Sequence, residues 1–191
     1  MALLIAGLII FLGIHSVSIV APTWRDAQLA RRGERVWKGA YSVASLIGFL
    51  LLLYGYGAAR QSSPILYAPP AAMRHLALLL MLPVFPLLLA AYLPGRIQSL
   101  TRHPMLLAII IWALAHLLAN GTLADVWLFG AFLVWAVLDR MAVTRRAVPR
   151  VVRGAPASKI NDWIAVAGGL AIYAAFVMGV HSWLIGVSPL R

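Results

Sequence analysis

The sequence lacks cysteine and has few acidic residues. None of its 191 residues is Cys, which excludes disulfides, thiolate nucleophiles, iron–sulfur clusters and cysteine-rich zinc sites. Only 5 residues are Asp or Glu, and no pair of them falls deep within an apolar segment. This scarcity argues against a proton relay, a carboxylate metal site and paired acid–base hydrolysis. The sequence also offers no convincing Ser–His–Asp pattern and no glycine-rich phosphate loop.

Charge of any kind is scarce, and apolar residues dominate. Charged residues make up 11% of the chain and hydrophobic residues 63%, with a mean hydropathy of +0.91. A soluble domain usually carries about 25% charged residues. The net charge is +11, but the basic residues gather in short segments between long apolar runs, as topology signals do. The sequence therefore predicts an all-α integral membrane protein with a lipid bilayer, not nucleic acid, as its partner.

Six apolar segments reach the roughly 20 residues that a membrane span needs, or come close to it. The predicted spans are residues 2–21, 37–58, 72–93, 104–120, 123–140 and 163–187, which together form a single transmembrane domain over residues 1–191. The first basic residue, Arg25, follows the first apolar run, so this run is predicted to be a retained helix rather than a signal peptide. Pro83 and Pro86 each predict a kink in the third span.

The fourth and fifth spans are predicted to form a tight antiparallel hairpin. The turn Asn120-Gly121-Thr122 separates them, and Gly is favoured where a helix ends. Thr122 and Asp125 have the spacing at which a hydroxyl and a carboxylate cap the first turn of a helix.

The basic residues predict the orientation. Thirteen of the 16 Lys and Arg residues lie on one side, in the segments after the first, third and fifth spans, and Arg60, Arg74 and Arg191 lie on the other. The positive-inside rule places the richer side in the cytoplasm and both termini outside it. The segment Ala142–Asp162 is then predicted to lie on the cytoplasmic membrane surface, where its basic residues are attracted to anionic headgroups.

Histidines are the main candidates for chemistry, because all five lie within or at the edge of a predicted span. A single membrane histidine is most often a packing residue. Two deep ones, His15 and His116, without acidic partners favour axial ligation of haem iron, with Phe11 and Trp112 as walls. At 1.5 Å per residue they lie about 10 and 18 Å from the cytoplasmic edge. Depth alone equally allows a pair of His116 with His181.

The chain resembles the NnrU family of bacterial membrane proteins along essentially its whole length. The resemblance is carried by Gly13-Ile14-His15-Ser16, Thr101-Arg102-His103-Pro104, Trp112-Ala113-Leu114-Ala115-His116-Leu117-Leu118-Ala119-Asn120-Gly121 and Leu128-Phe129-Gly130. The family is named from genes associated with nitrite and nitric oxide metabolism in denitrifying bacteria. It is also similar to plant zeta-carotene isomerase, a membrane enzyme that uses haem b. The resemblance implies a multi-pass protein of the bacterial inner membrane. In such a protein, the non-cytoplasmic side on which the positive-inside rule places both termini is the periplasm.

The resemblance also implies which histidines bind the cofactor. The motifs that hold the two haem-ligating histidines of the isomerase match those around His15 and His116. This chain has Ala113 where the isomerase has a Cys, so a switch of ligand to a thiolate is impossible here. The implied function is haem b chemistry, either linked to nitrogen oxides or isomerising an apolar polyene. If the protein is an enzyme, it would be a haem-dependent isomerase or redox enzyme, and its catalytic residues are unknown.

A second site is predicted at Arg102-His103-Pro104. Pro104 suits the first turn of a helix, whose free N–H groups, together with Arg102 and His103, would bind an anion such as a haem propionate or a lipid phosphate. A similar Arg-His-Pro sequence occurs in membrane methyltransferases that bind S-adenosylmethionine. Those enzymes continue with Tyr and Gly, where this chain has Leu106 and Ala108, which disfavours that alternative.

Three hypotheses remain open at this stage. The protein is a haem enzyme, a haem-containing sensor or assembly factor that supports nitric oxide reduction without catalysis, or a haem-free structural membrane protein.

Overall fold

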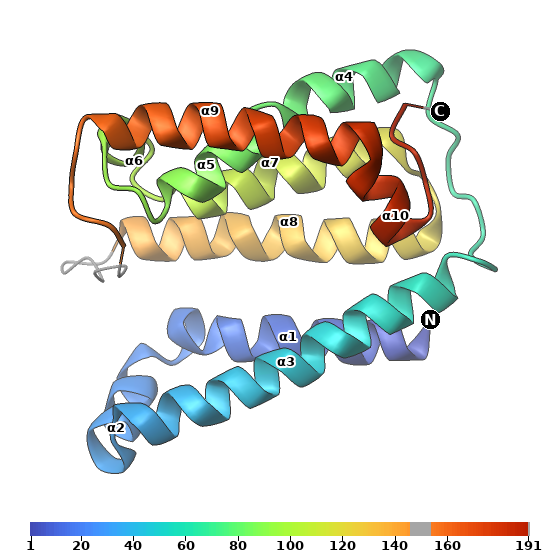
Figure 1. Ribbon diagram of the computed structural model, residues 1–191. Coiled ribbons are helices and arrows are strands. Elements are labelled where there is room, and N and C mark those ends of the chain that lie inside the picture. The colour runs from blue at the N-terminus through green and yellow to red at the C-terminus, as the bar shows by residue number, and fades with distance from the viewer. Residues whose placement is uncertain (146–153, 191) are drawn as a thin grey trace.

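The computed structural model describes residues 1–145 and 154–190, and this part of the chain is a bundle of helices (Figure 1). The helices, in chain order, are α1 (Ala2–Val20), α2 (Pro22–Arg32), α3 (Glu34–Ala59), α4 (Ala71–Met81), α5 (Val84–Ala90), α6 (Arg96–Thr101), α7 (Pro104–Ala119), α8 (Leu123–Thr144), α9 (Ile160–Ala175), a π-helix (Phe176–Val180) and α10 (His181–Ile185).

Within the described residues, five helical stretches are long and apolar enough to cross a membrane, which confirms the predicted all-α membrane bundle. They are Ala2–Val20, Glu34–Ala59, Ala71–Ala90, Leu123–Thr144 and Ile160–Ile185. The remaining predicted span, α7, is apolar but has only 16 residues. At 1.5 Å per residue it measures about 24 Å, less than the roughly 30 Å of a hydrocarbon core. The count of six spans therefore stays a prediction.

The helices α1, α7, α8 and α9 run roughly along one direction, and α3 crosses α1 at a tilt (Figure 1). α1 and α3 pack side by side as a pair, and α8 lies between this pair and the group formed by α5, α7 and α9. The marked N- and C-terminal ends of the chain lie at the same end of the bundle. This arrangement is the one that an even number of passes produces.

Glycines allow α1 and α3 to approach closely. A Cβ at Gly7 would lie 2.6 Å from the backbone nitrogen of Leu52, and a Cβ at Gly55 would lie 2.5 Å from that of Leu4. Gly48 faces Phe11 in the same way, at 2.7 Å from its nitrogen. Within a bilayer, helices gain little from apolar burial against each other, so small residues that permit close backbone packing hold such a pair together.

The third predicted span breaks at Pro83 but not at Pro86. α4 ends at Met81 and α5 begins at Val84, with Pro83 at its N-cap. Pro86 lies in the first turn of α5, where backbone N–H groups have no acceptor within the helix, so its missing N–H removes no bond. The predicted kink at Pro86 was therefore wrong. A Cβ at Gly169 of α9 would lie 2.3 Å from the nitrogen of Pro86, so α5 and α9 are in close contact there.

Two short helices, α2 and α6, lie in segments between the predicted spans. α2 begins with Pro22 at its first turn and ends at Gly33, which has a φ of 81°. Pro at the start and Gly just past the end are the expected boundaries of a helix. Trp24 of α2 meets Trp37 in the first turn of α3 edge to face, with ring centroids 5.8 Å apart.

The predicted turn between α7 and α8 is confirmed. Thr122 Oγ1 accepts from the Asp125 N–H at 3.3 Å, and the Thr122 N–H donates to Asp125 Oδ2 at 2.9 Å, which completes the capping box. Tyr56 of α3 donates its hydroxyl to Asp125 Oδ1 at 2.6 Å. The backbone of Tyr67 approaches position 121 so closely that only glycine fits, because a Cβ there would lie 1.9 Å from the carbonyl oxygen of Tyr67.

Replacing Asp125 is expected to destabilise this end of the bundle. Asp125→Ala removes the acceptor of the Tyr56 hydroxyl and of two Thr122 groups from a buried position, and unsatisfied buried donors cost about 1–3 kcal/mol each. We expect the free energy of unfolding in detergent to fall by about 3 kcal/mol. Thr122→Ser keeps the capping hydroxyl and is the matched control. Equal stability of the two variants would contradict a structural role for Asp125.

Part of the segment Ala142–Asp162 lies outside the described residues, namely 146–153 with Arg146, Arg150 and Arg153, so its surface location stays a prediction. Its described end packs on the loop before α6. Asn161 donates to the carbonyl oxygen of Pro94 at 2.8 Å. Asp162 accepts from the N–H groups of Arg96 and Ile97 at 2.9 and 3.0 Å. Asp162 therefore caps the start of α6, because a carboxylate satisfies N–H groups left free in the first turn.

Candidate functional site

His15 lies on α1, five residues before its C-terminal end. Its Nδ1 is 2.7 Å from the carbonyl oxygen of Phe11. A carbonyl oxygen only accepts, so Nδ1 carries a proton, and in the neutral imidazole Nε2 then keeps its lone pair. Metal-binding histidines are commonly oriented in this way by a hydrogen bond from their other nitrogen.

Aromatic rings from three helices surround the imidazole of His15. Its centroid lies 4.3 Å from that of Phe11 on the same helix, 5.2 Å from that of Tyr41 on α3 and 6.0 Å from that of Trp135 on α8. The indole Nε1 of Trp135 is buried and has no hydrogen-bond acceptor among the described residues. Buried donors are normally paired. The N–H of Trp135 is therefore an unused hydrogen-bond donor in the surroundings of His15.

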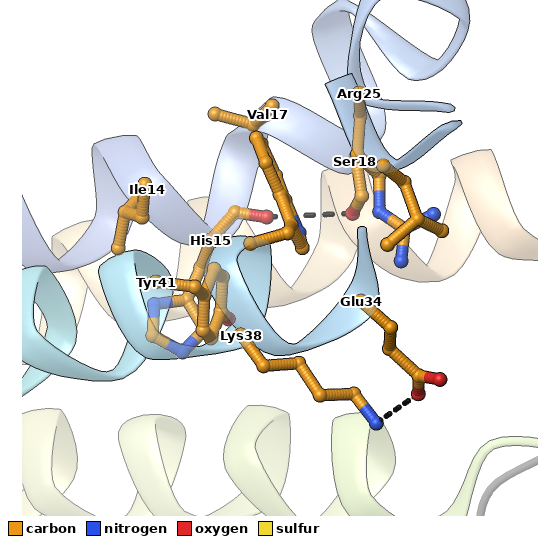
Figure 2. A pocket seen from close by; sticks show the side chains of 10 residues that line it. Ile14, His15, Val17, Ser18, Arg25, Glu34, Lys38 and Tyr41 are labelled. Carbon is orange, nitrogen blue, oxygen red and sulfur yellow. Dashed lines mark hydrogen bonds and ion pairs between the residues drawn. The ribbon is translucent and has the colours of Figure 1, made fainter. Parts of the chain in front are cut away.

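A pocket of about 290 Å³ opens beside His15, between α1, α2 and α3 (Figure 2). Its wall is partly apolar and partly charged. The lining residues are Ile14, His15, Val17, Ser18, Arg25, Leu29, Glu34, Trp37, Lys38 and Tyr41. The pocket exists because α2 folds back against α3 and leaves space below the end of α1.

His116 lies three residues before the end of α7 and has the same local geometry as His15. Its Nδ1 is 2.8 Å from the carbonyl oxygen of Trp112, which again leaves Nε2 with its lone pair. The ring stacks on Phe129 of α8 at 4.6 Å and lies 5.2 Å from the ring of Trp112. Ala113, which lies one helical turn before His116, is fully buried.

Both histidines contact one aromatic layer, which consists of Phe11, Phe132 and Trp112, but their imidazole rings do not contact each other. His15 contacts Trp135 and His116 contacts Phe129, and these α8 residues are six positions apart, about 9 Å along the helix. Three rings connect the imidazoles. Phe11 meets Phe132 at 5.8 Å, and Phe132 meets Trp112 at 5.6 Å. The separation agrees with the depth difference of about 8 Å expected from helix rise.

Arg102 and His103 lie at the N-terminal end of α7, whereas His116 lies near its C-terminal end. They precede His116 by thirteen or more residues, which is about 20 Å along the helix axis. Arg102 is exposed and has a φ of 60°. His103 is the N-cap residue of α7. Arg140 of α8 donates to the carbonyl oxygens of His103 and Thr101 at 3.3 and 3.2 Å. The structure therefore does not bring this predicted anion site to His116.

The other two histidines differ in their surroundings. His75 is exposed on α4. His181 directly follows the π-helix, and its Nδ1 is 2.7 Å from the carbonyl oxygen of Val187. Among the described residues, no group of three or more His, Asp or Glu side chains is placed to hold a metal ion.

Sequence reasoning missed four residues around His15: Arg25, Lys38, Tyr41 and Trp135. They come from α2, α3 and α8, and their proximity depends on tertiary packing. The helix boundary signals Pro22 and Gly33 would have revealed α2. Nothing in the sequence indicated that α2 would turn its Arg25 towards His15.

Comparisons with known proteins identify the family of the chain. Neither the curated proteins nor the solved structures gave a match to the chain. The family model described as NnrU protein matches residues 3–189, so the chain belongs to the NnrU family.

Proposed function

We propose that the protein is a b-type haem-binding protein of the bacterial inner membrane, with His15 and His116 as the iron ligands. The observation that carries the proposal is their shared geometry. Each histidine donates Nδ1–H to the carbonyl oxygen four residues earlier and keeps Nε2 as a donor atom. Haem would supply an iron that binds small molecules such as nitric oxide or exchanges one electron.

The residues present fit haem better than a bare metal ion. A bare ion needs several protein ligands, and the described residues offer no cluster of three. Haem needs only one or two axial donors and a flat apolar surface. Phe11, Trp112 and Phe132 provide aromatic surface beside both histidines.

Ligation of one iron by both imidazoles requires the aromatic layer to open. In the structure, Phe11, Phe132 and Trp112 connect the two rings. We therefore expect these side chains to change rotamer when haem binds. The exposed Arg102, together with His103 at the start of α7, is assigned to a lipid phosphate, because it is distant from His116 along that helix.

The haem would serve chemistry linked to nitrite and nitric oxide metabolism, or isomerisation of an apolar polyene. The proposal is tested by the absorption spectrum of protein purified in detergent, which should show a b-type haem. Conversion of a cis-polyene would indicate the isomerase, and a nitric oxide complex without turnover would indicate the sensor or assembly role. Colourless protein after reconstitution with haem would contradict the proposal.

We also propose that both termini face the periplasm, from the distribution of basic residues and the common location of the chain ends. A reporter that is active only in the cytoplasm should be silent when fused after Arg191. The same reporter inserted at Gly33, between α2 and α3, should be active. Immunoblotting would control for equal expression. Activity after Arg191 would show that α7 does not span the membrane or that the orientation is reversed.

A further inference from the structure

The pocket between α1, α2 and α3 lies where the chain leaves its first apolar helix and enters the next. α1 ends at Val20 and α3 begins at Glu34, and both are long and apolar enough to cross a membrane, whereas α2 between them carries three arginines and has no buried residue. Trp37 lines the pocket, and its ring packs against that of Trp24. Tryptophan is enriched at the level of the lipid headgroups. The pocket is therefore expected at the boundary between membrane and water, within reach of phospholipids.

The lining of this pocket has an apolar part and a charged part. The apolar part includes Ile14, Val17 and Leu29. The charged part consists of Arg25 and of Lys38 with Glu34, which form an ion pair with each other (Figure 2). Because that pair is neutral as a whole, Arg25 leaves the lining with one net positive charge. A phosphodiester carries one negative charge and balances it, whereas a second negative charge on the ligand would be repelled by Glu34.

Arg25 can bind a phosphate without giving up its ion pair. Its side chain is 24% exposed, against 60% for its partner Asp26, which is not among the residues that line the pocket. One Nη donates to Asp26 at 2.6 Å, and a guanidinium has five N–H donors. The planar group is suited to two oxygens of a phosphate, because it forms paired, charge-assisted hydrogen bonds with them.

We propose that this pocket binds a membrane phospholipid, with the phosphodiester on Arg25 and the first part of an acyl chain against Ile14 and Leu29. A soluble phosphate would use only the charged part of the pocket, whereas a phospholipid uses both parts. The bound lipid would hold α2 at the membrane surface, together with the packing of Trp24 on Trp37. Lipid binding here involves no haem, so it goes beyond the proposed function and is measured independently of it.

The test counts the lipids bound to the whole protein in detergent by native mass spectrometry, with phosphatidylglycerol as the probe because its only charge is the phosphodiester. Arg25→Gln should weaken the tightest binding event about tenfold, since the charge-assisted hydrogen bonds to the phosphate are lost. Arg31→Gln is the matched control, because Arg31 is an exposed arginine of the same helix that does not line the pocket. It should bind the lipid like the wild type. Equal affinities of the two variants would mean that α2 attracts anionic lipid only in a general way, and the proposal would be wrong.

Two further ligands distinguish a phospholipid from other occupants. Diacylglycerol with the same acyl chains lacks the phosphate, so it should bind the wild type no better than it binds Arg25→Gln. A preference of diacylglycerol for the wild type would show that Arg25 acts on the fold rather than on a phosphate. Excess inorganic phosphate should not displace phosphatidylglycerol, because it leaves the apolar part of the pocket unused. Displacement would identify a site for soluble anions and overturn the proposal.

Arg25→Lys keeps the test decisive if Arg25→Gln does not fold. Lysine retains the positive charge but lacks the planar group that binds two oxygens at once. Arg25→Lys should therefore bind phosphatidylglycerol more weakly than the wild type, with diacylglycerol binding unchanged. Affinity for phosphatidylglycerol equal to that of the wild type would contradict the paired contact with Arg25.

Discussion

His15→Ala and His116→Ala are each expected to abolish a low-spin b-type haem spectrum. Two neutral imidazoles put a strong-field donor on each face of the iron and leave no open position. Loss of either should give high-spin haem with one ligand, or protein without haem. Absorption and electron paramagnetic resonance spectra distinguish these states, and the ratio of haem to protein measures retention.

The other histidines provide the controls. His75→Ala should leave the spectrum unchanged, because His75 is exposed on α4. His181→Ala should also leave it unchanged. His103→Ala should retain the spin state. If His181→Ala alone removes haem, the ligand pair is His116 with His181, and the role assigned to His15 is wrong.

Local features of the fold were predictable from the sequence, because they depend on neighbouring residues. The capping box of Thr122 with Asp125 and the break at Pro83 were both recognised from spacing and residue type. The kink wrongly expected at Pro86 depended on where α5 begins. Residue type predicts a kink equally at both prolines, and it does not show that the new helix begins at Val84, which places Pro86 in a first turn.

The surroundings of the candidate site were less predictable. Depth along each helix predicts an offset of about 8 Å between His15 and His116, and their α8 neighbours Trp135 and Phe129 are about 9 Å apart along that helix. The residues around His15 depend on which helices are neighbours. Tyr41 and Trp135 lie 26 and 120 positions further along the chain, and only the packing of α1 against both α3 and α8 brings them together. Hydrophobicity does not specify that packing, because every face of a membrane helix is apolar.

Substitution of the glycines between α1 and α3 is expected to separate these helices. At Gly55 the new methyl carbon of an alanine would lie 2.5 Å from the backbone nitrogen of Leu4, and at Gly48 it would lie 2.7 Å from that of Phe11. Backbone atoms cannot rotate away as a flexible side chain does, so the helices must move. We expect Gly48→Ala and Gly55→Ala each to lower the free energy of unfolding by about 1–3 kcal/mol, the usual cost of overpacking.

Gly57→Ala and Gly13→Ala are matched controls on the same two helices, because a Cβ at either position has open space around it. These controls should be neutral or more stable by up to about 1 kcal/mol, since alanine is the better helix former. The sign of the effect therefore distinguishes contact glycines from the others. Measurement is by denaturation in mixed detergent micelles, and a stability of Gly55→Ala equal to that of Gly57→Ala would contradict the close packing.

Gly48→Ala should also affect the cofactor. Phe11, which Gly48 touches, accepts the Nδ1–H bond of His15 through its carbonyl oxygen. Displacement of Phe11 would therefore move the imidazole, whereas Gly55 meets α1 at Leu4, near its start and about 16 Å from His15 along the helix. At equal loss of stability, Gly48→Ala is expected to lower haem retention more than Gly55→Ala does. Equal retention in the two variants would show that the position of His15 is independent of the contact between Gly48 and Phe11.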